Sequence, residues 1–381
     1  MTPITDNVRL REFCDAVRHS EFIAVDTEFM RETTYWPKLC LIQAASIDGA
    51  AVIDPLADEI DLEPFLELMR DENVIKVFHA CRQDVEIFHN LDAMPRPIFD
   101  TQVAAMAAGY GEQIAYDALM RQVLKVEIDK SSRFTDWARR PLSDAQLTYA
   151  AGDVTHLAKA YPRIIDRLER EGRLGWVEEE MEALSDPAAY DTDPENAWRR
   201  LKPRKFTPRY LAAFKAAAAF RERAAQTRDL PRGRVFKDEA MDEIASQAPS
   251  SLEALANMRS LGKGFAGSRF GPELLDALRE ALRDPEAYAP VIERAPPPPQ
   301  GAAAVVELLK VLLKARAEDA GVASKLIATV GDLEKIAAGD EDAAALKGWR
   351  REVFGEDALR LKRGELALML KGSRVKVAEL V

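Results

Sequence analysis

Two carboxylates interrupt a short apolar stretch near the start of the chain. Residues 22–29 read FIAVDTEF, so Asp26 and Glu28 are two positions apart in a predicted β-strand. Alternate residues of a strand share one face, which places both side chains on the same side. Like charges beside each other in a sheet repel and are costly to remove from water. The spacing therefore predicts a cationic partner at this site.

Three further residues extend this pattern. Asp84 lies in CRQDVEIF, where a predicted strand is followed by a helix, and Tyr149 and Asp153 lie in YAAGD, on one face of a helix. Sites of α/β proteins lie where strands are followed by helices. An isolated Asp-x-Glu is common at exposed strand ends, so the prediction depends on the combination.

The four carboxylates predict phosphodiester chemistry. A donor set made only of oxygen suits a pair of hard divalent cations, Mg²⁺ or Mn²⁺, rather than zinc. Two such ions about 3.5–4 Å apart can clamp a phosphodiester during in-line displacement. A tyrosine hydroxyl is too weak an acid to be the expected base, so we expect Tyr149 to orient the attacking water.

The predicted elements form a mixed sheet with helices on its faces. Strands are predicted at 22–29, 38–46, 50–55 and 74–80, and helices near 62–70, 81–90, 101–109 and 116–124. The Asp48-Gly49 pair indicates a hairpin between the second and third strands. Ser143 is the expected N-cap of a long helix at 144–170, which Pro162 is expected to kink rather than end.

The chain changes character after about residue 200, where its pattern becomes almost entirely helical. Its 381 residues predict two or three domains, and the run APPPPQG is a stiff linker. We therefore predict an α/β domain at 1–175, a linker at 176–203, a small all-α domain at 204–290, a Pro-rich linker at 291–300 and a second small all-α domain at 301–381.

The net charge of −11 conceals an uneven distribution. Residues 177–197 hold eight acids and no Lys or Arg, whereas residues 198–237 hold thirteen Lys or Arg and two acids. The basic segment is compatible with phosphate binding and equally with a solvated helix face. Three cysteines without a Cys-x-x-Cys pair, no long apolar run and no visible secretory signal predict a cytoplasmic protein that is not embedded in a membrane.

Several of these segments resemble a known family. VDTEF, the helix of Asp84 and YAAGD are similar to the three motifs of DEDD exonucleases, and the Tyr-x3-Asp form resembles the DEDDy branch. Together with FHACRQDVEIF, IFDTQVAA and DWARRPLSDAQLTYAAGDV, they resemble the ribonuclease D family, whose helical HRDC modules the two C-terminal blocks resemble. The match spans nearly the whole chain.

The resemblance implies a ribonuclease H-like exonuclease domain followed by two HRDC-like domains. It implies a 3′-to-5′ exoribonuclease that releases nucleoside 5′-monophosphates, with tRNA precursors and other small structured RNAs as substrates. Asp26, Glu28, Asp84 and Asp153 occupy the family's metal-ligand positions, and Tyr149 completes the five catalytic positions. No protein partner can be inferred.

Substrate contacts are predicted near these motifs. Aromatic and apolar side chains can stack on a terminal base, and arginines can bind phosphates. The candidates are Phe29, Met30, His79, Gln102, Arg139 and Arg140, with Lys130 and Arg133 in the same loop as the arginines, and Tyr35 and Trp36 as weaker aromatic candidates. Each is also compatible with a structural role. In the first helical block, Arg228, Arg232, Arg234 and Lys237 surround a turn that could bind phosphates.

Two alternatives stay open from the sequence. The same chemistry could act on DNA, as in repair exonucleases, although no polymerase-sized or helicase-sized region is present. The chain could also be a non-catalytic RNA-binding scaffold of HRDC modules, which the intact acidic set disfavours.

Overall fold

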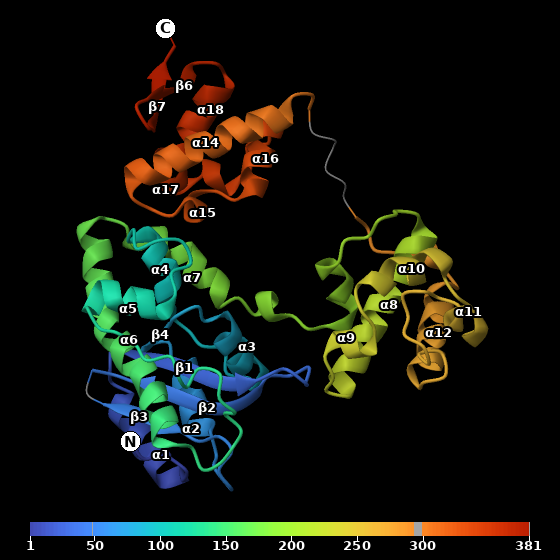
Figure 1. Cartoon of the computed structure of the whole chain (residues 1–381), viewed down its shortest axis with the longest axis horizontal. Helices are drawn as coiled ribbons and strands as arrows, with labels where there is room; N and C mark the ends of the chain where they lie inside the picture. Colours follow the sequence, from blue (N-terminus) through green and yellow to red (C-terminus); the bar gives the residue numbers. More distant parts are fainter. Residues whose placement is uncertain (48, 293–298, 381) are drawn as a thin grey trace. The chain divides into compact units, whose positions relative to one another are not determined.

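The computed structural model describes residues 1–47, 49–292 and 299–380 (Figure 1). The tip of the predicted Asp48-Gly49 turn and most of the predicted Pro-rich linker at 291–300 lie outside these residues. Among the described residues, no helix combines the length and apolar character that a membrane-spanning segment requires. All three cysteines lie in the described ranges, are buried and form no disulfide.

The N-terminal region is built on a mixed sheet with five strands in the described part of the chain. Its strands are β1 (Phe22–Met30), β2 (Lys38–Ala45), β3 (Ala50–Ile53), β4 (Ile75–Phe78) and β5 (Ile98–Asp100), in the order β3-β2-β1-β4-β5. β2 and β3 pair antiparallel, whereas β1 with β4 and β4 with β5 pair parallel. The predicted mixed sheet is therefore confirmed, with β1 at its centre.

Helices surround this sheet. They are α1 (Asn7–Val17), α2 (Glu63–Arg70), α3 (Arg82–Asn90), α4 (Thr101–Ala107), α5 (Tyr116–Leu124) and α6 (Asp144–Arg170). Helix α6 packs against β3, β4, α4 and α5 (Figure 1). Its apolar face joins the core of the sheet. Helix α1 is capped by Asp6 and was not among the predicted elements.

The beginning of α6 is fixed locally by its cap. The Ser143 hydroxyl accepts a hydrogen bond from the Gln146 amide, and the Gln146 side chain binds back to the Ser143 backbone. This reciprocal capping box satisfies backbone donors that a helix start leaves unpaired. Pro162 lies inside the helix without ending it. The predicted helix 144–170 is confirmed, and its first half carries Tyr149 and Asp153.

The segment predicted as a linker at 176–203 is folded into short helices. These are η1 (Leu174–Trp176), α7 (Glu178–Leu184), η2 (Pro187–Tyr190) and η3 (Pro194–Arg200). Contacts divide the chain into two compact units near this point. The first contains residues 1–27 and 41–186 with the C-terminal region, and the second contains residues 28–40 and 187–294.

The helical part of the second unit surrounds α8 (Pro208–Thr227), which is buried on most of its sides. The other helices are α9 (Arg232–Val235), α10 (Glu239–Gln247), α11 (Leu252–Ala256), α12 (Phe270–Ala281) and α13 (Pro285–Tyr288). The alanine-rich sequence of α8 explains its burial, because small side chains let α10 and α12 pack closely against it.

The C-terminal region contains helices and a terminal hairpin. Its helices are α14 (Ala302–Ala320), α15 (Ser324–Ile327), α16 (Val330–Ala338), η4 (Ala344–Leu346), α17 (Gly348–Arg350), the π-turn η5 (Arg351–Gly355) and α18 (Glu356–Lys362). Strands β6 (Leu366–Lys371) and β7 (Arg374–Glu379) then pair antiparallel (Figure 1). The prediction of an all-α domain at 301–381 was therefore wrong for its last residues, where Gly372 adopts a left-handed turn and Val375 and Val377 alternate as in a strand.

This C-terminal region packs on the N-terminal region within the first unit. The rings of Trp176 and Trp349 stack with centroids 4.3 Å apart and planes 2° from parallel. Arg350 donates hydrogen bonds of 2.7 Å to Glu179 and 2.6 Å to Glu180, both on α7. Two acids of the run at 177–197, Glu179 and Glu180, therefore bind the C-terminal region.

Candidate active site

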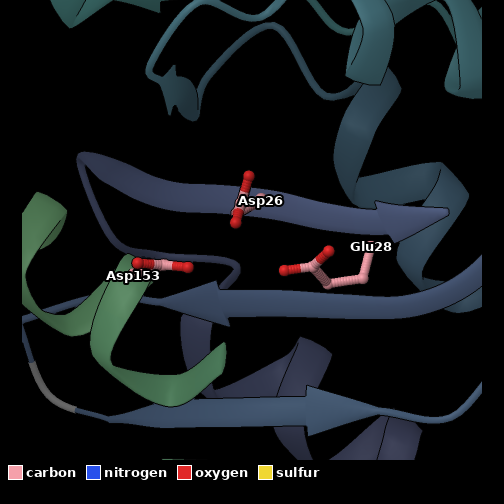
Figure 2. Close-up of side chains that lie close together, drawn as sticks. All are labelled: Asp26, Glu28 and Asp153. Carbon is pink, nitrogen blue, oxygen red and sulfur yellow. The ribbon is translucent and has the colours of Figure 1, made fainter. Parts of the chain in front are cut away.

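Strand β1 and helix α6 bring three carboxylates together. Asp26 and Glu28 lie two residues apart on β1, and Asp153 lies in the first half of α6. Each of the three offers an oxygen atom that lies within 4.8 Å of the others. Figure 2 shows the three side chains converging from the strand and the helix. The face of β1 that carries Asp26 and Glu28 therefore meets the face of α6 that carries Asp153.

The electrostatics of this cluster favour a bound cation. Burial and, to a smaller extent, the charge of the nearby Asp153 together raise the pKa of Asp26 to about 8. Burial likewise raises the pKa of Asp153 to about 7, against the opposing effects of a hydrogen bond from Tyr149 and the charge of Arg133. Without a cation the cluster therefore retains protons near neutral pH. A donor set of three carboxylates fits a hard divalent cation.

Asp84 lies beside this cluster but outside the group of three. It occupies the first turn of α3, is 7% exposed, and accepts a hydrogen bond from the hydroxyl of Thr27. Thr27 stands between Asp26 and Glu28 in the sequence. Burial, and then the charge of Asp26, raise the pKa of Asp84 well above its ordinary value. The carboxyl groups of Asp84 and Asp26 are thus close enough to influence each other.

Asp100, at the end of β5, fixes the backbone directly before the start of α3. Its carboxylate accepts hydrogen bonds from the backbone amides of Ala80 at 3.1 Å and Cys81 at 2.8 Å, and it also caps α4. Ala80 adopts a left-handed φ of 60°, which costs energy for a residue with a side chain. Sequence reasoning missed this role of Asp100, although an Asp directly before a helical pattern is an N-cap signal.

A pocket of about 390 Å³ lies next to the acidic cluster. Its lining includes Asp26, His79, Gln102, Tyr116, Lys130, Arg133, Tyr149 and Asp153. Four of the predicted substrate-facing residues therefore line one pocket with two of the acids and Tyr149. Tyr116 was not predicted; its hydroxyl donates a hydrogen bond to the backbone carbonyl of Asp153, which fixes this turn of α6.

His79 and Gln102 have structural partners as well as a place in the pocket wall. His79 lies 3.0 Å from the Thr101 hydroxyl and 3.1 Å from the carbonyl oxygen of Ile114, and Gln102 donates to the same carbonyl at 3.1 Å. Burial lowers the pKa of His79, which favours the neutral ring. Both side chains are therefore held in place at the edge of the pocket.

Comparisons with known proteins agree with this geometry. Residues 1–171 match a family described as 3′-5′ exonuclease, and residues 211–278 match the HRDC domain. Ribonuclease D of Granulibacter bethesdensis is 51% identical, with 99% of this chain and 96% of that protein covered. Ribonuclease D of Nitrobacter hamburgensis is 52% identical, with 98% of each covered. The chain belongs to the ribonuclease D family.

A solved structure supports the same assignment. Escherichia coli RNase D, an exoribonuclease involved in structured RNA processing, is 29% identical and superposes with a TM-score of 0.81 over 96% of this chain and 99% of its own. As a ribonuclease D, the chain is a metal-dependent 3′-5′ exoribonuclease that acts on RNA. The predicted family and activity, and the HRDC identity of the first helical block, are confirmed.

The basic loop before α6 divides into two parts in this ribonuclease D. Lys130 and Arg133 line the pocket, whereas Arg139 and Arg140 are not among the residues that line it. Arg140 forms two hydrogen bonds of 2.6 Å with the carboxylate of Asp54, and Arg139 is exposed. The role predicted for Arg140 in phosphate binding therefore competes with an ion pair inside the protein.

Other aromatic and apolar candidates are placed differently. Phe29 and Met30 are half-buried at the end of β1, and neither is among the pocket-lining residues. Phe134, which was not predicted, is 89% exposed and lies 5.2 Å beneath the guanidinium of Arg133. An exposed ring next to a pocket-lining arginine indicates a candidate substrate contact. The sequence did not reveal it, because exposed and buried aromatic residues look alike there.

Proposed function

We propose that this ribonuclease D removes nucleotides one at a time from RNA 3′ ends with two divalent cations, Mg²⁺ or Mn²⁺, and releases nucleoside 5′-monophosphates. Asp26, Glu28, Asp84 and Asp153 would hold the cations. The observation that carries the proposal is the approach of Asp26, Glu28 and Asp153 to within 4.8 Å of one another. Asp84, tied to the strand of Asp26 through Thr27, completes the ligand set.

Each residue has a separate task in this proposal. When bound, the cations would lower the pKa of the attacking water and neutralise the charge that develops on the phosphate. Tyr149 holds Asp153 through a hydrogen bond and orients the water with its hydroxyl. Its ring packs beside that of Trp137, with centroids 6.1 Å apart.

The terminal nucleotide would occupy the pocket beside the acids. Lys130 and Arg133 supply positive charge for phosphate groups, and His79 and Gln102 supply polar groups for the sugar or base. Phe29, Met30, Arg139 and Arg140 are proposed as further contacts outside the pocket wall.

We propose tRNA precursors and other small structured RNAs with 3′ extensions as substrates, in the cytoplasm. The description of the Escherichia coli relative as a processor of structured RNA supports this substrate class. Three buried cysteines without disulfides suit a reducing compartment. The C-terminal region, with helices and a hairpin, is proposed as a second and modified HRDC-like domain.

The test is a time course on a 5′-labelled tRNA with a short 3′ extension, in Mg²⁺, in Mn²⁺ and in EDTA. Wild type should shorten the RNA in single-nucleotide steps only with a cation, and Asp153→Asn should lose this activity. Asp166→Asn, an exposed change of the same kind on the same helix, is the matched control and should retain it. Shortening by Asp153→Asn at the wild-type rate would contradict the proposed ligand set.

A parallel experiment addresses DNA as an alternative substrate. An oligodeoxyribonucleotide with the same sequence as the RNA extension is incubated under the same conditions. The proposal predicts faster shortening of RNA than of DNA. Equal or faster shortening of DNA would contradict the proposal and favour a 3′-5′ DNA exonuclease of the repair type.

A further inference from the structure

The loop between β1 and β2 is anchored inside the first helical domain. Residues 28–40 share a compact unit with residues 187–294. Tyr35, at the tip of this loop, is 3% exposed and belongs to the same hydrophobic cluster as α8, α10 and α12. Its ring lies 4.6 Å from the guanidinium of Arg232 and 4.7 Å from the ring of Trp36.

The hydroxyl of Tyr35 enters a buried charged network. It donates to the carboxylate of Glu222, which is 1% exposed, and accepts hydrogen bonds from Arg232 at 3.0 Å and Gln226 at 3.1 Å. Glu222 also binds Arg232 at 2.6 Å and Arg200 at 2.9 Å. Burial alone would raise the pKa of Glu222, but the bonds from Arg232 and Tyr35 outweigh it and lower that pKa.

Asp229 fixes the backbone of the same loop. One of its carboxylate oxygens accepts hydrogen bonds from the amides of Tyr35 at 2.9 Å and Trp36 at 3.0 Å. The loop also closes on itself, because Arg31 donates to the carbonyl of Tyr35 at 3.2 Å and Thr34 donates to that of Trp36 at 2.7 Å. Side chain and main chain of the loop are therefore both tied to the helical domain.

Core packing alone does not explain this arrangement. Apolar side chains of similar volume can replace a buried ion pair at little cost or with a gain in stability. A buried glutamate and two arginines instead fix one hydroxyl through directional bonds, and Asp229 fixes two amides. All three belong to the segment that directly follows the strand end with Glu28, Phe29 and Met30.

We propose that Tyr35, Glu222 and Asp229 are positioning residues for the exonuclease reaction, through which the first helical domain fixes the end of β1 and hence Glu28. The inference rests on the proposed function of Glu28 as a cation ligand. It also gives Arg232 a task other than phosphate contact, since this arginine neutralises Glu222. The HRDC module then acts on the catalytic step.

The test uses the full-length protein with Tyr35→Phe, which removes only the hydroxyl, and Asp229→Ala, which removes the acceptor of both loop amides. Asp229→Asn retains one acceptor oxygen and serves as the conservative rescue. The matched control is Tyr210→Phe, because Tyr210 is also 3% exposed, lies on α8, and donates to Asp242 at 2.8 Å away from the loop. Mg²⁺ affinity is measured by calorimetry, and kcat and KM on a single-stranded oligoribonucleotide.

Tyr35→Phe and Asp229→Ala should each lower Mg²⁺ affinity and kcat roughly tenfold with KM nearly unchanged, the size typical of residues that support metal ligands. Asp229→Asn should recover most of the loss, and Tyr210→Phe should keep wild-type Mg²⁺ affinity even where it lowers Tm. Wild-type Mg²⁺ affinity and kcat in the folded loop variants would overturn the inference. So would an equal loss in Tyr210→Phe, which would indicate a general structural effect.

Glu28→Gln separates this inference from the proposed function. If Glu28→Gln loses Mg²⁺ affinity and the loop variants do not, only the positioning inference fails. If Glu28→Gln binds Mg²⁺ as wild type does, the ligand role of Glu28 fails and the positioning inference fails with it.

Discussion

The hydroxyl of Thr27 donates a hydrogen bond to the carboxylate of Asp84. Thr27 lies on β1 between two acids of the cluster, and Asp84 lies on α3, so this bond joins two of the three sequence motifs directly. The hydrogen bond lowers the pKa of Asp84, against the larger opposing effects of burial and of Asp26. Thr27 therefore helps to keep Asp84 ionised.

Thr27→Val should weaken the enzyme because it removes the hydroxyl at nearly constant volume. A hydrogen bond to a charged group contributes about 1.5–3 kcal/mol, so we expect a roughly tenfold or greater fall in kcat. The pKa of Asp84 should rise, which moves the acidic limb of the pH–kcat profile to higher pH. Thr27→Ser, which keeps the hydroxyl, is the control. An unchanged profile in Thr27→Val would show that this bond does not tune Asp84.

Mg²⁺ should stabilise the protein more at about pH 8 than at about pH 6. The folded pKa values of Asp26, about 8, and Asp153, about 7, exceed the ordinary value of 3.8. Cation-free folded protein therefore binds more protons than unfolded protein, and its stability falls as the pH rises from about 4 to about 8. Mg²⁺ binds the ionised carboxylates, so its binding offsets this loss and releases protons.

The measurement is the change in Tm on adding Mg²⁺ at the two pH values, with proton release followed by calorimetry in two buffers of different ionisation enthalpy. Asp26→Asn removes one of the titrating groups and should reduce both effects. The same increase in Tm at both pH values, without proton release, would contradict the prediction.

Tyr149→Phe should lower kcat by roughly 100-fold while KM for RNA changes little, because a group that orients the water acts in the chemical step. The phenylalanine ring can keep the contact with Trp137, so folding should be retained. Tyr161→Phe is the control, since Tyr161 is a buried tyrosine of the same helix that packs in the core. A loss confined to KM would instead indicate that Tyr149 binds substrate.

Phe134→Ala should weaken the binding of single-stranded 3′ ends. Phe134 is 89% exposed beside Arg133, and stacking of a base on an aromatic ring contributes about 1–3 kcal/mol, equivalent to a roughly 5- to 150-fold rise in KM. Val8→Ala, at an exposed position of α1, tests whether loss of any exposed apolar side chain has this effect. Wild-type KM in Phe134→Ala would exclude this ring as a stacking surface.

Arg350→Ala should loosen the C-terminal region from α7. The Arg350 side chain is 8% exposed and bonds Glu179, Glu180 and the carbonyl of Leu326. Because the glutamates are more exposed, we expect a loss of only about 1–3 kcal/mol in the free energy of unfolding. Arg351→Ala, which removes an exposed pair with Glu356, should change it by less than about 0.5 kcal/mol. Urea unfolding of both variants makes the comparison, and equal losses would contradict it.

Several features of the fold and the site followed from local spacing. The two-residue period of β1 put Asp26 and Glu28 on one face, and the helical period put Tyr149 and Asp153 on one face of α6. The Ser143 cap was predicted because a capping box involves only residues three apart. The terminal hairpin was missed because its short alternating strands follow a long helical pattern and, within the described part of the chain, pair only with each other.

Contacts between distant elements could not be predicted in this way. Arg140 and Tyr35 were both candidates for substrate contact, yet Arg140 binds Asp54 and Tyr35 is buried against Glu222, 187 residues away. Neither partner can be inferred from residue type, because many acids in the chain could serve equally well. Which one does so depends on how the elements pack.

The sequence by itself therefore determined the chemical types at the active site, the elements that carry them and the family to which the chain belongs. The tertiary structure alone decided that Asp153 meets Asp26 and Glu28, that Asp84 is linked to them through Thr27, and that the loop after β1 is held by Asp229. The physical reason is the distance along the chain over which each effect acts. Backbone periodicity acts over a few residues, whereas the position of a charge relative to a distant partner is set by the packing of whole elements.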